Sequence, residues 1–195
     1  KDSPIEKLTL NEGITTIGNH AFRETKIEDL VIPHSVETIG IAAFTESPIE
    51  KLTLNEGITT IGDHAFRKTK IKDLVIPHSV ETISQDAFSI ESLTTVTIGN
   101  GVKQIGDYAF YGTQLKEVDI PNSVETIGEA AFRESPIEKL TLNEGITTIG
   151  ASAFSSTKLS KVDIPNSVET IDIGAFYKVD PLTNATIGNG VKQIC

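Results

Sequence analysis

The sequence contains no methionine or tryptophan, only one cysteine, and no apolar run that approaches the roughly 18 residues of a membrane-spanning helix. The single Cys195 excludes an internal disulfide and leaves a free thiol or a link to another molecule. No charged and then apolar leader precedes Lys1. We therefore expect a segment without a membrane span, which is either a piece of a longer chain or engineered.

Basic residues are also scarce in this chain. Lysine and arginine number 17 against 27 aspartates and glutamates, which gives a net charge of −10 and a pI near 4.8. Binding to nucleic acid requires Lys and Arg to displace the counterions along the phosphates. The composition therefore argues against nucleic acid as a partner and disfavours other acidic partners.

What the sequence has in abundance is repetition. A fixed period of 20 to 50 residues is the signature of a solenoid, in which each residue stacks on its equivalent in the next repeat. Here the period is 22 residues. It is marked by all eight phenylalanines, each preceded by alanine: Phe22, Phe44, Phe66, Phe88, Phe110, Phe132, Phe154 and Phe176.

Five further columns follow the same period. Counted from Ile5 as position 1, positions 1, 4, 6, 10 and 13 are apolar in all eight full repeats, which predicts one domain with one continuous core. We expect phenylalanine to fill the wider end of each repeat. The about 8.5 repeats span 5–26, 27–48, 49–70, 71–92, 93–114, 115–136, 137–158, 159–180 and, after a one-residue insertion, 182–195.

Each repeat combines a strand signal with turn signals. Positions 4 to 6, such as Leu8-Thr9-Leu10, alternate apolar and polar residues, so stacked repeats predict a parallel sheet. Proline at position 7 of the even repeats, as in Pro33, has no N–H to donate and must end the strand. Glycine at position 14 of six repeats permits a left-handed or closely packed corner. The next stretch, 19–23 in the first repeat, suits only one helical or 3₁₀ turn, which we expect on the return face.

A second period of two repeats overlies the first. Residues 5–26 and 49–70 differ at two positions only, and 137–158 is nearly as close. Three of the four full odd repeats carry Leu-Asn-Glu-Gly-Ile where even repeats carry Ile-Pro-His/Asn-Ser-Val. The chain is therefore expected to present two unlike surfaces that alternate along its length.

These columns resemble those of the BspA-like class of leucine-rich repeats of bacterial cell-surface proteins. The likeness covers the whole chain and is plain in the segment Val-Asp-Ile-Pro-Asn-Ser-Val-Glu-Thr-Ile at 162–171, followed by Ala175-Phe176. It implies an α/β solenoid that forms a right-handed, curved superhelix with short parallel strands on its concave face. It also implies a cell-surface or secreted protein that acts in adhesion or protein binding. The sequence departs from the class in having Thr25, Ser47 and Thr69 where cysteine is often found.

No catalytic, metal-binding or cofactor-binding site is predicted. A near-perfect repeat places like groups in rows, whereas catalysis needs unlike groups in one pocket. His20 and His64 share a column, as do His34 and His78. The two histidines of each pair are separated by two repeats of about 4.8 Å each, which is too far for both to bind one metal ion. The row of Glu37, Glu81, Glu125 and Glu169 is interpreted as a solvated acidic edge.

Positions 3, 5 and 7 point away from the predicted core and form a candidate binding strip on the expected concave face. Lysine and aspartate alternate at position 3 in the first four repeats, either to avoid repulsion between neighbouring strands or to bind a partner. The strip comprises Lys7, Thr9, Asn11, Asp29, Lys51, Thr53, Asn55, Asp73, Glu117, Asp119, Lys139, Thr141, Asn143, Lys161 and Asp163.

The sequence thus predicts a non-catalytic protein-binding or adhesion module of a bacterial surface protein. Its partner would be a protein, of a host or of the extracellular matrix. The alternative is a structural spacer or an end-to-end self-associating scaffold, natural or engineered, because the uncapped ends of a solenoid expose core and invite stacking.

Overall fold

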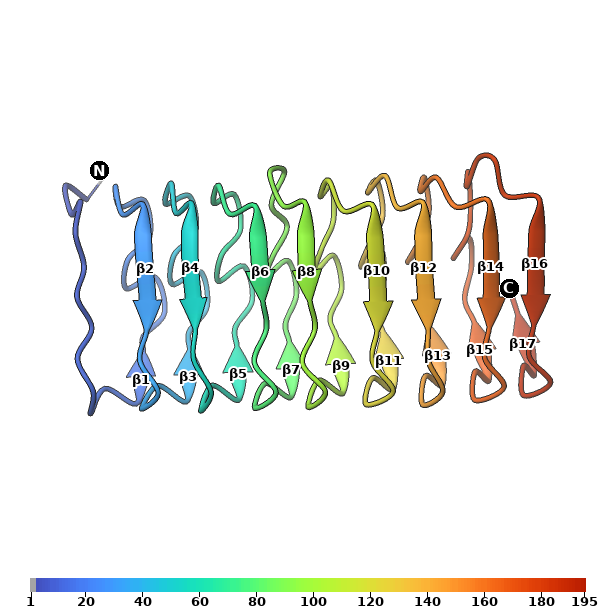
Figure 1. Cartoon of the computed structure of the whole chain (residues 1–195), viewed down its shortest axis with the longest axis horizontal. Coiled ribbons are helices and arrows are strands. Elements are labelled where there is room, and N and C mark those ends of the chain that lie inside the picture. Colours follow the sequence, from blue (N-terminus) through green and yellow to red (C-terminus); the bar gives the residue numbers. More distant parts are fainter. Residues whose placement is uncertain (1–2) are drawn as a thin grey trace.

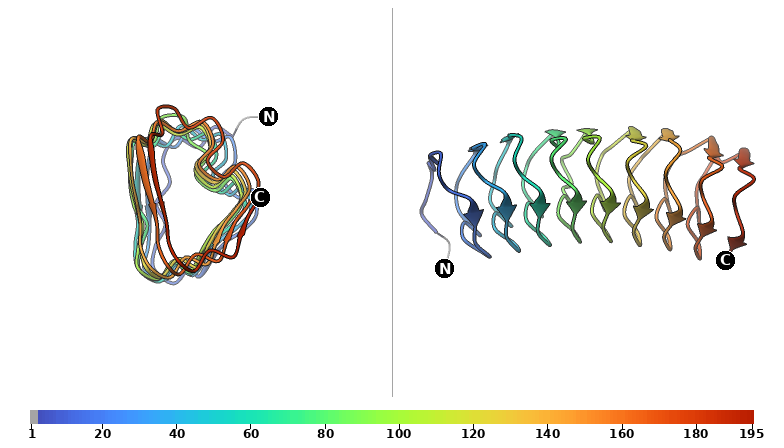
Figure 2. Two further views of the ribbon diagram at one scale, coloured as in Figure 1. Left: turned by 90° about the vertical axis from the view of Figure 1, so that its right-hand side faces the viewer. Right: turned by 90° about the horizontal axis from the view of Figure 1, so that it is seen from below.

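The computed structural model describes residues 3–195, along which the chain winds as a right-handed coil of stacked turns (Figures 1 and 2). Each turn, here called a rung, is one repeat, and the rungs are numbered from 1 at residues 5–26. Seen along the coil in Figure 2, a rung has one long flat side, one shorter sloping side and an indented return side. The described residues include no helix.

A parallel sheet of nine two-residue strands runs along the sloping side. It ends at position 13, where the isoleucines lie in register, for example Ile39 opposite Ile61. Glycine follows at position 14. A Cβ atom on Gly150 would lie 2.7 Å from the carbonyl carbon of Gly128, so glycine lets rung 7 pack closely on rung 6 at this point. The strands are β1 (Thr16–Ile17), β3 (Thr38–Ile39), β5 (Thr60–Ile61), β7 (Thr82–Ile83), β9 (Gln104–Ile105), β11 (Thr126–Ile127), β13 (Thr148–Ile149), β15 (Thr170–Ile171) and β17 (Gln193–Ile194).

Longer strands form the flat side, which is called the strand face below. They do not form the continuous sheet that the sequence predicts, because they pair only as β2–β4, β6–β8, β10–β12 and β14–β16. Figure 1 shows the wider gaps between these pairs. The strands are β2 (Asp29–Ile32), β4 (Lys51–Leu54), β6 (Asp73–Val75), β8 (Thr95–Thr97), β10 (Glu117–Ile120), β12 (Lys139–Leu142), β14 (Lys161–Ile164) and β16 (Asn184–Ile187).

Proline explains why the sheet is interrupted at every second rung. Within each strand pair, the N–H at position 3 of the odd rung is donated to the preceding rung, as from Lys51 to the carbonyl of Glu28 at 3.1 Å. Every second residue of a parallel strand faces the same neighbour, so position 7 would donate in the same direction. Even rungs have proline there, as in Pro77, and it has no N–H to give. Each gap therefore lies between an odd rung and the even rung that follows.

The core is a set of stacked columns, as the sequence predicts. Successive phenylalanine rings stack with centroids 5.1–5.8 Å apart and interplanar angles of 14° or less. The six rings from Phe44 to Phe154 are fully buried, whereas Phe22 and Phe176 are half-buried. The isoleucines, leucines and valines of the other columns pack against this stack.

The return side does not contain the expected helical or 3₁₀ turns. Positions 16 and 20 adopt positive φ angles, such as 57° at His20 and 54° at Glu24, and these interrupt any right-handed helical run. Moreover, the N–H groups of Phe22 and Glu24 donate to carbonyls of the next rung at 2.8 and 2.9 Å. A helix would need those donors for its own bonds, so the chain forms successive turns instead.

The expected concave strand face is also not found. Figure 2 shows an array that bows only gently, with the strand face on the outer side of the bow. The reason is that the proline gaps widen the strand face, whereas the nine-stranded sheet on the sloping side keeps every rung in hydrogen-bonded register. Wider spacing on one side of a stack places that side outside the curve.

Phe110→Ala tests the phenylalanine stack. Phe110 is fully buried between Phe88 and Phe132, so the substitution should leave a cavity and lower the free energy of unfolding by about 3–5 kcal/mol. Denaturant unfolding followed by circular dichroism measures this loss. The matched control is Phe176→Ala, which removes a half-buried ring stacked on one neighbour and should cost clearly less. Equal losses for the two variants would contradict a continuous stack.

Candidate functional site

The strand face presents alternate side chains to solvent. In β2, Asp29 and Val31 are exposed, while Leu30 and Ile32 are buried. The same alternation in β10 and β14 places position 3 and position 5 on the outside. The candidate strip therefore lies on one face, as its spacing predicts, although that face is not the inner side of the bow.

Thirteen of the fifteen strip residues are exposed, and the exceptions are Asn55 and Asn143, which are half-buried. Their amide groups donate to the backbone carbonyls of Ile32 at 3.0 Å and Ile120 at 2.8 Å in the preceding rung. These two side chains thus tie rungs together at the end of a strand pair. The sequence did not distinguish them from their exposed neighbours.

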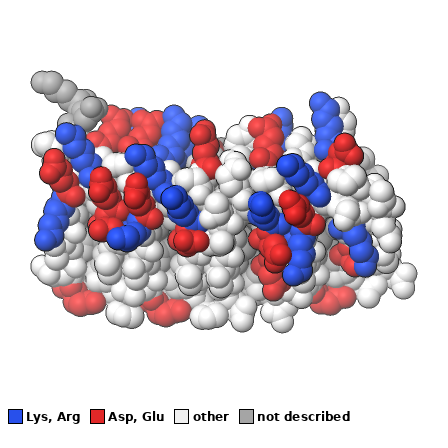
Figure 3. Space-filling view, turned by 45° about the horizontal axis from the view of Figure 1, so that its top comes forward, with Lys and Arg blue, Asp and Glu red and all other residues white. Residues whose placement is uncertain are grey.

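Opposite charges on the strip face each other within the strand pairs. Lys51 lies 3.7 Å from Asp29 across β2–β4, and Lys139 lies 3.4 Å from Glu117 across β10–β12. Exposed ion pairs of this kind contribute only about 0–1 kcal/mol. The alternation at position 3 therefore avoids repulsion between strands while leaving the charged groups accessible. Figure 3 shows the two signs interspersed rather than gathered in one patch.

One ion pair of the strip lies within a single strand. The ammonium of Lys161 is 2.7 Å from the carboxylate of Asp163. Hydrogen bonds from Lys161 and from the hydroxyl of Thr186 hold the pKa of Asp163 below its ordinary value. The carboxylate is therefore ionised at neutral pH.

A second set of carboxylates, which sequence analysis missed, joins rungs across the proline gaps. The oxygens of Glu56 accept the N–H groups of His78 at 3.1 Å and Ser79 at 2.9 Å in the next rung. The Ser79 hydroxyl accepts the N–H of Gly57 at 3.0 Å and donates to the carbonyl of Ile58 at 2.8 Å. Gly57 has a φ of +114°, which glycine adopts readily. We call this arrangement the carboxylate clasp.

With that of Glu56 included, the clasp is present at three of the four junctions between an odd rung and the even rung that follows it. Glu12 binds the N–H groups of His34 and Ser35, and Glu144 binds those of Asn166 and Ser167. The backbone hydrogen bond from His78 lowers the pKa of Glu56, and those from Ser167 and Asn166 lower the pKa of Glu144. The sequence signal was a Glu at position 8 followed 23 residues later by Ser.

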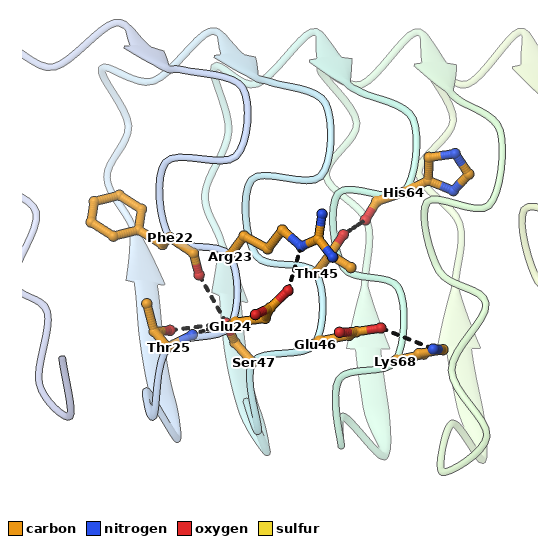
Figure 4. A network of polar contacts seen from close by, with 9 residues as sticks. All are labelled: Phe22, Arg23, Glu24, Thr25, Thr45, Glu46, Ser47, His64 and Lys68. Carbon is orange, nitrogen blue, oxygen red and sulfur yellow. Dashed lines mark hydrogen bonds and ion pairs between the residues drawn. The ribbon is translucent and has the colours of Figure 1, made fainter. Parts of the chain in front are cut away.

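Polar contacts also join rungs on the return side (Figure 4). The buried hydroxyls of Thr25 and Ser47 lie 2.9 Å apart, and Ser47 donates to the carbonyl of Phe22 at 2.9 Å. On the surface, Lys68 pairs with Glu46 at 2.9 Å and lowers the pKa of that carboxylate. The network holds the rungs in register and brings no catalytic set together.

The remaining titratable groups form rows. Glu37, Glu81, Glu125 and Glu169 are all exposed, which confirms the solvated acidic edge. Within residues 3–195, no three His, Cys, Asp or Glu side chains are placed to hold a metal ion. In the same part of the chain, no helix is long and apolar enough to cross a membrane. Cys195 is exposed and unpaired.

Comparison with known sequences identifies the repeat. A family model described as the BspA type leucine-rich repeat region, in six copies, matches residues 1–114 and 83–195. These two ranges together cover the whole chain. No curated protein matches the sequence.

Solved structures share the solenoid. A leucine-rich repeat protein from Bacteroides ovatus ATCC 8483 is similar with a TM-score of 0.58 and 20% identity, over 96% of this chain and 62% of that one. The pneumococcal vaccine antigen PcpA gives a TM-score of 0.56 and 23% identity, over 92% of this chain and 56% of that one. These likenesses show the fold. The chain spans 62% or less of the length of either structure.

Glu144→Gln tests the carboxylate clasp through its pH dependence. The pKa of Glu144 is lowered in the folded state, so its stabilising effect is complete above the ordinary glutamate pKa of about 4.3 and is lost as the pH falls through the folded value. We expect the variant to melt about 1–2 °C lower than the parent chain at pH 7, and this difference to vanish in acid. Thermal unfolding at several pH values measures it.

The control for this experiment is Glu125→Gln. Glu125 is exposed, and its side chain makes no hydrogen bond or ion pair with the part of the chain that the structure describes. Its substitution should change the melting temperature little at either pH. Equal melting temperatures of Glu144→Gln and the parent chain at pH 7 would show that the clasp does not stabilise the fold, and a difference that persists unchanged in acid would show that the effect does not come from the ionised carboxylate.

Proposed function

Since the chain belongs to the BspA type leucine-rich repeat family, we propose that it is a non-catalytic module that binds a protein partner at the bacterial cell surface. The observation that carries this proposal is the row of exposed side chains on the strand face, held at fixed spacing by a continuous core. The partner would be a host or extracellular-matrix protein, and the strip would be its contact surface.

Two apolar residues extend the strip. Val31 and Val75 occupy position 5 of rungs 2 and 4, and they are 57% and 64% exposed. They lie between Asp29 or Asp73 and the start of the next corner, so rungs 2 and 4 each offer a charge beside an apolar side chain. No aromatic residue lies at positions 3, 5 or 7 of the full repeats, and aromatic anchors usually carry tight interfaces. Binding by this face would therefore gain strength from many similar contacts.

A rigid spacer is the second candidate function. Its support is the nine-stranded sheet, which runs without interruption from β1 to β17, together with the unbroken phenylalanine stack. A rod of this kind would hold another domain at a fixed distance. Stacking end to end with further copies belongs to the same class of function. Light scattering over a range of concentrations distinguishes the rigid spacer from the end-to-end scaffold, because a spacer stays monomeric and a self-associating scaffold does not.

The strip is tested by replacing Lys7, Lys51 and Lys139 with Glu together. All three are exposed at position 3 of odd rungs, so the variant reverses three of the strip's four positive charges without touching the core. Binding to a panel of immobilised extracellular-matrix proteins is measured by surface plasmon resonance. We expect the parent chain to bind at least one of them and the variant to bind it roughly tenfold more weakly, which corresponds to about 1.4 kcal/mol.

A matched variant controls for net charge. Lys26, Lys70 and Lys158 are exposed at position 22, outside the strip, and their replacement by Glu makes the same change in total charge. This control should bind as the parent chain does. If both variants bind equally well, the strip is not the contact surface.

A further inference from the structure

The junction between β8 and β10 lacks the carboxylate clasp that closes the other three proline gaps. Asn100 stands at position 8 of rung 5, where Glu12, Glu56 and Glu144 stand in rungs 1, 3 and 7. The corner has the sequence Gly99-Asn100-Gly101, and Gly101 does not adopt the positive φ angle of its equivalent Gly57. The corner therefore follows a different path and brings no carboxylate to the next rung.

Polar groups of rung 6 are left without partners as a result. The N–H groups of Asn122 and Ser123 correspond to those that Glu56 binds in rung 4, but they have no acceptor within residues 3–195. The Ser123 hydroxyl is shielded from solvent and likewise has no hydrogen-bond partner there. A buried polar group without a partner costs about 1–3 kcal/mol. The junction thus holds an open cradle of donors.

A cavity of about 610 Å³ on the strand face reaches this cradle at Asn122, which forms part of its wall. The space exceeds what a single carboxylate needs and falls within the range of ligand pockets, about 300–1,000 Å³. Its walls combine apolar and amide groups, and they include His78, Ile98, Asn100, Pro121, Asn122 and Asn143. The cavity is therefore suited to a side chain that carries a terminal acceptor.

The surroundings of the cradle favour an anion over a cation. Rung 5 has no charged side chain from Leu93 to Val102. The Nδ1 atom of His78 accepts the N–H of Asn100 at 3.0 Å, so the proton of the neutral ring is on Nε2, which is a donor. Asp119, the one acidic residue in the wall, accepts a hydrogen bond from the amide of Asn143 at 2.9 Å.

We propose that the amides of Asn122 and Ser123 bind the carboxylate of an aspartate or glutamate side chain of a partner polypeptide. The group is a carboxylate because the equivalent pair of amides takes one, with one oxygen for each N–H, at all three other junctions. The inference rests on the proposed function only for the source of the carboxylate. The net charge of −10 opposes an acidic partner at long range, but at about 0.1 M salt this repulsion is screened beyond roughly 10 Å.

The direct test is an NMR titration of the ¹⁵N-labelled chain with the blocked peptide acetyl-Gly-Glu-Gly-amide. Two amide hydrogen bonds give weak binding, so the peptide is raised to about 10 mM at about 0.15 M salt. We expect the amide protons of Asn122 and Ser123 to shift downfield, and those of Ser79 and Ser167 to stay in place because their acceptors are internal. The matching Gln peptide, which has the same shape without the charge, should cause no shift.

Two variants separate a real site from an incidental shift. Gly99→Asn with Asn100→Glu recreates the Asn-Glu-Gly corner of 55–57 and should abolish the response to the peptide. A Cβ on Gly99 would collide with the carbonyl of Pro77 in the present corner, so this variant needs the alternative corner path. Glu144→Ala tests the idea in the opposite direction. It should open an equivalent cradle and add a peptide response at Asn166 and Ser167.

Each outcome decides one part of the inference. Shifts at Asn122 and Ser123 with the Glu peptide, absent with the Gln peptide, support the site, and a gained response in Glu144→Ala supports it independently. Absence of both responses in folded protein overturns it. Equal shifts with acetate at the same concentration overturn a polypeptide as the source of the carboxylate. None of these results bears on the lysine variants of the strip.

Discussion

Direct stacking of each side chain on its equivalent one rung away is the constraint on which this structure depends. It makes the phenylalanine rings one continuous stack and the aliphatic positions continuous columns. Each full repeat therefore contributes one residue to every column of the core. It also explains the polar rows, because a hydroxyl or a carboxylate finds its partner in the next rung. Thr25 with Ser47 and Glu56 with Ser79 are examples.

Proline limits how far this stacking extends to the backbone. On the sloping side every rung bonds to the next, whereas on the strand face proline at position 7 removes one donor in each even rung. The two-repeat period of the sequence thus becomes a row of strand pairs with gaps between them. The carboxylate clasps close those gaps at one end, which lets the chain keep both proline and a continuous core.

A repeat protein acquires specific sites where its repeat is broken. Along most of this chain, equivalent groups satisfy each other, and the surface offers the same motif again and again. Rung 5 departs from the pattern at Asn100, and the groups that its missing carboxylate would bind are left open beside a cavity of about 610 Å³ on the strand face. A partner that recognises one place on the array would need a feature of this kind, in addition to the uniform strip.

The sequence alone determined the solenoid, its 22-residue rung, the identity of every core column and the outward direction of the strip, because each of these follows from periodicity. It could not reveal the absence of helical turns, since positive φ angles at residues such as His20 depend on bonds to the next rung. The paired strands and the gentle bow likewise required the structure, because they depend on which neighbour each N–H faces. The open amides of Asn122 and Ser123 became visible only by comparing junctions in space, where one carboxylate is missing.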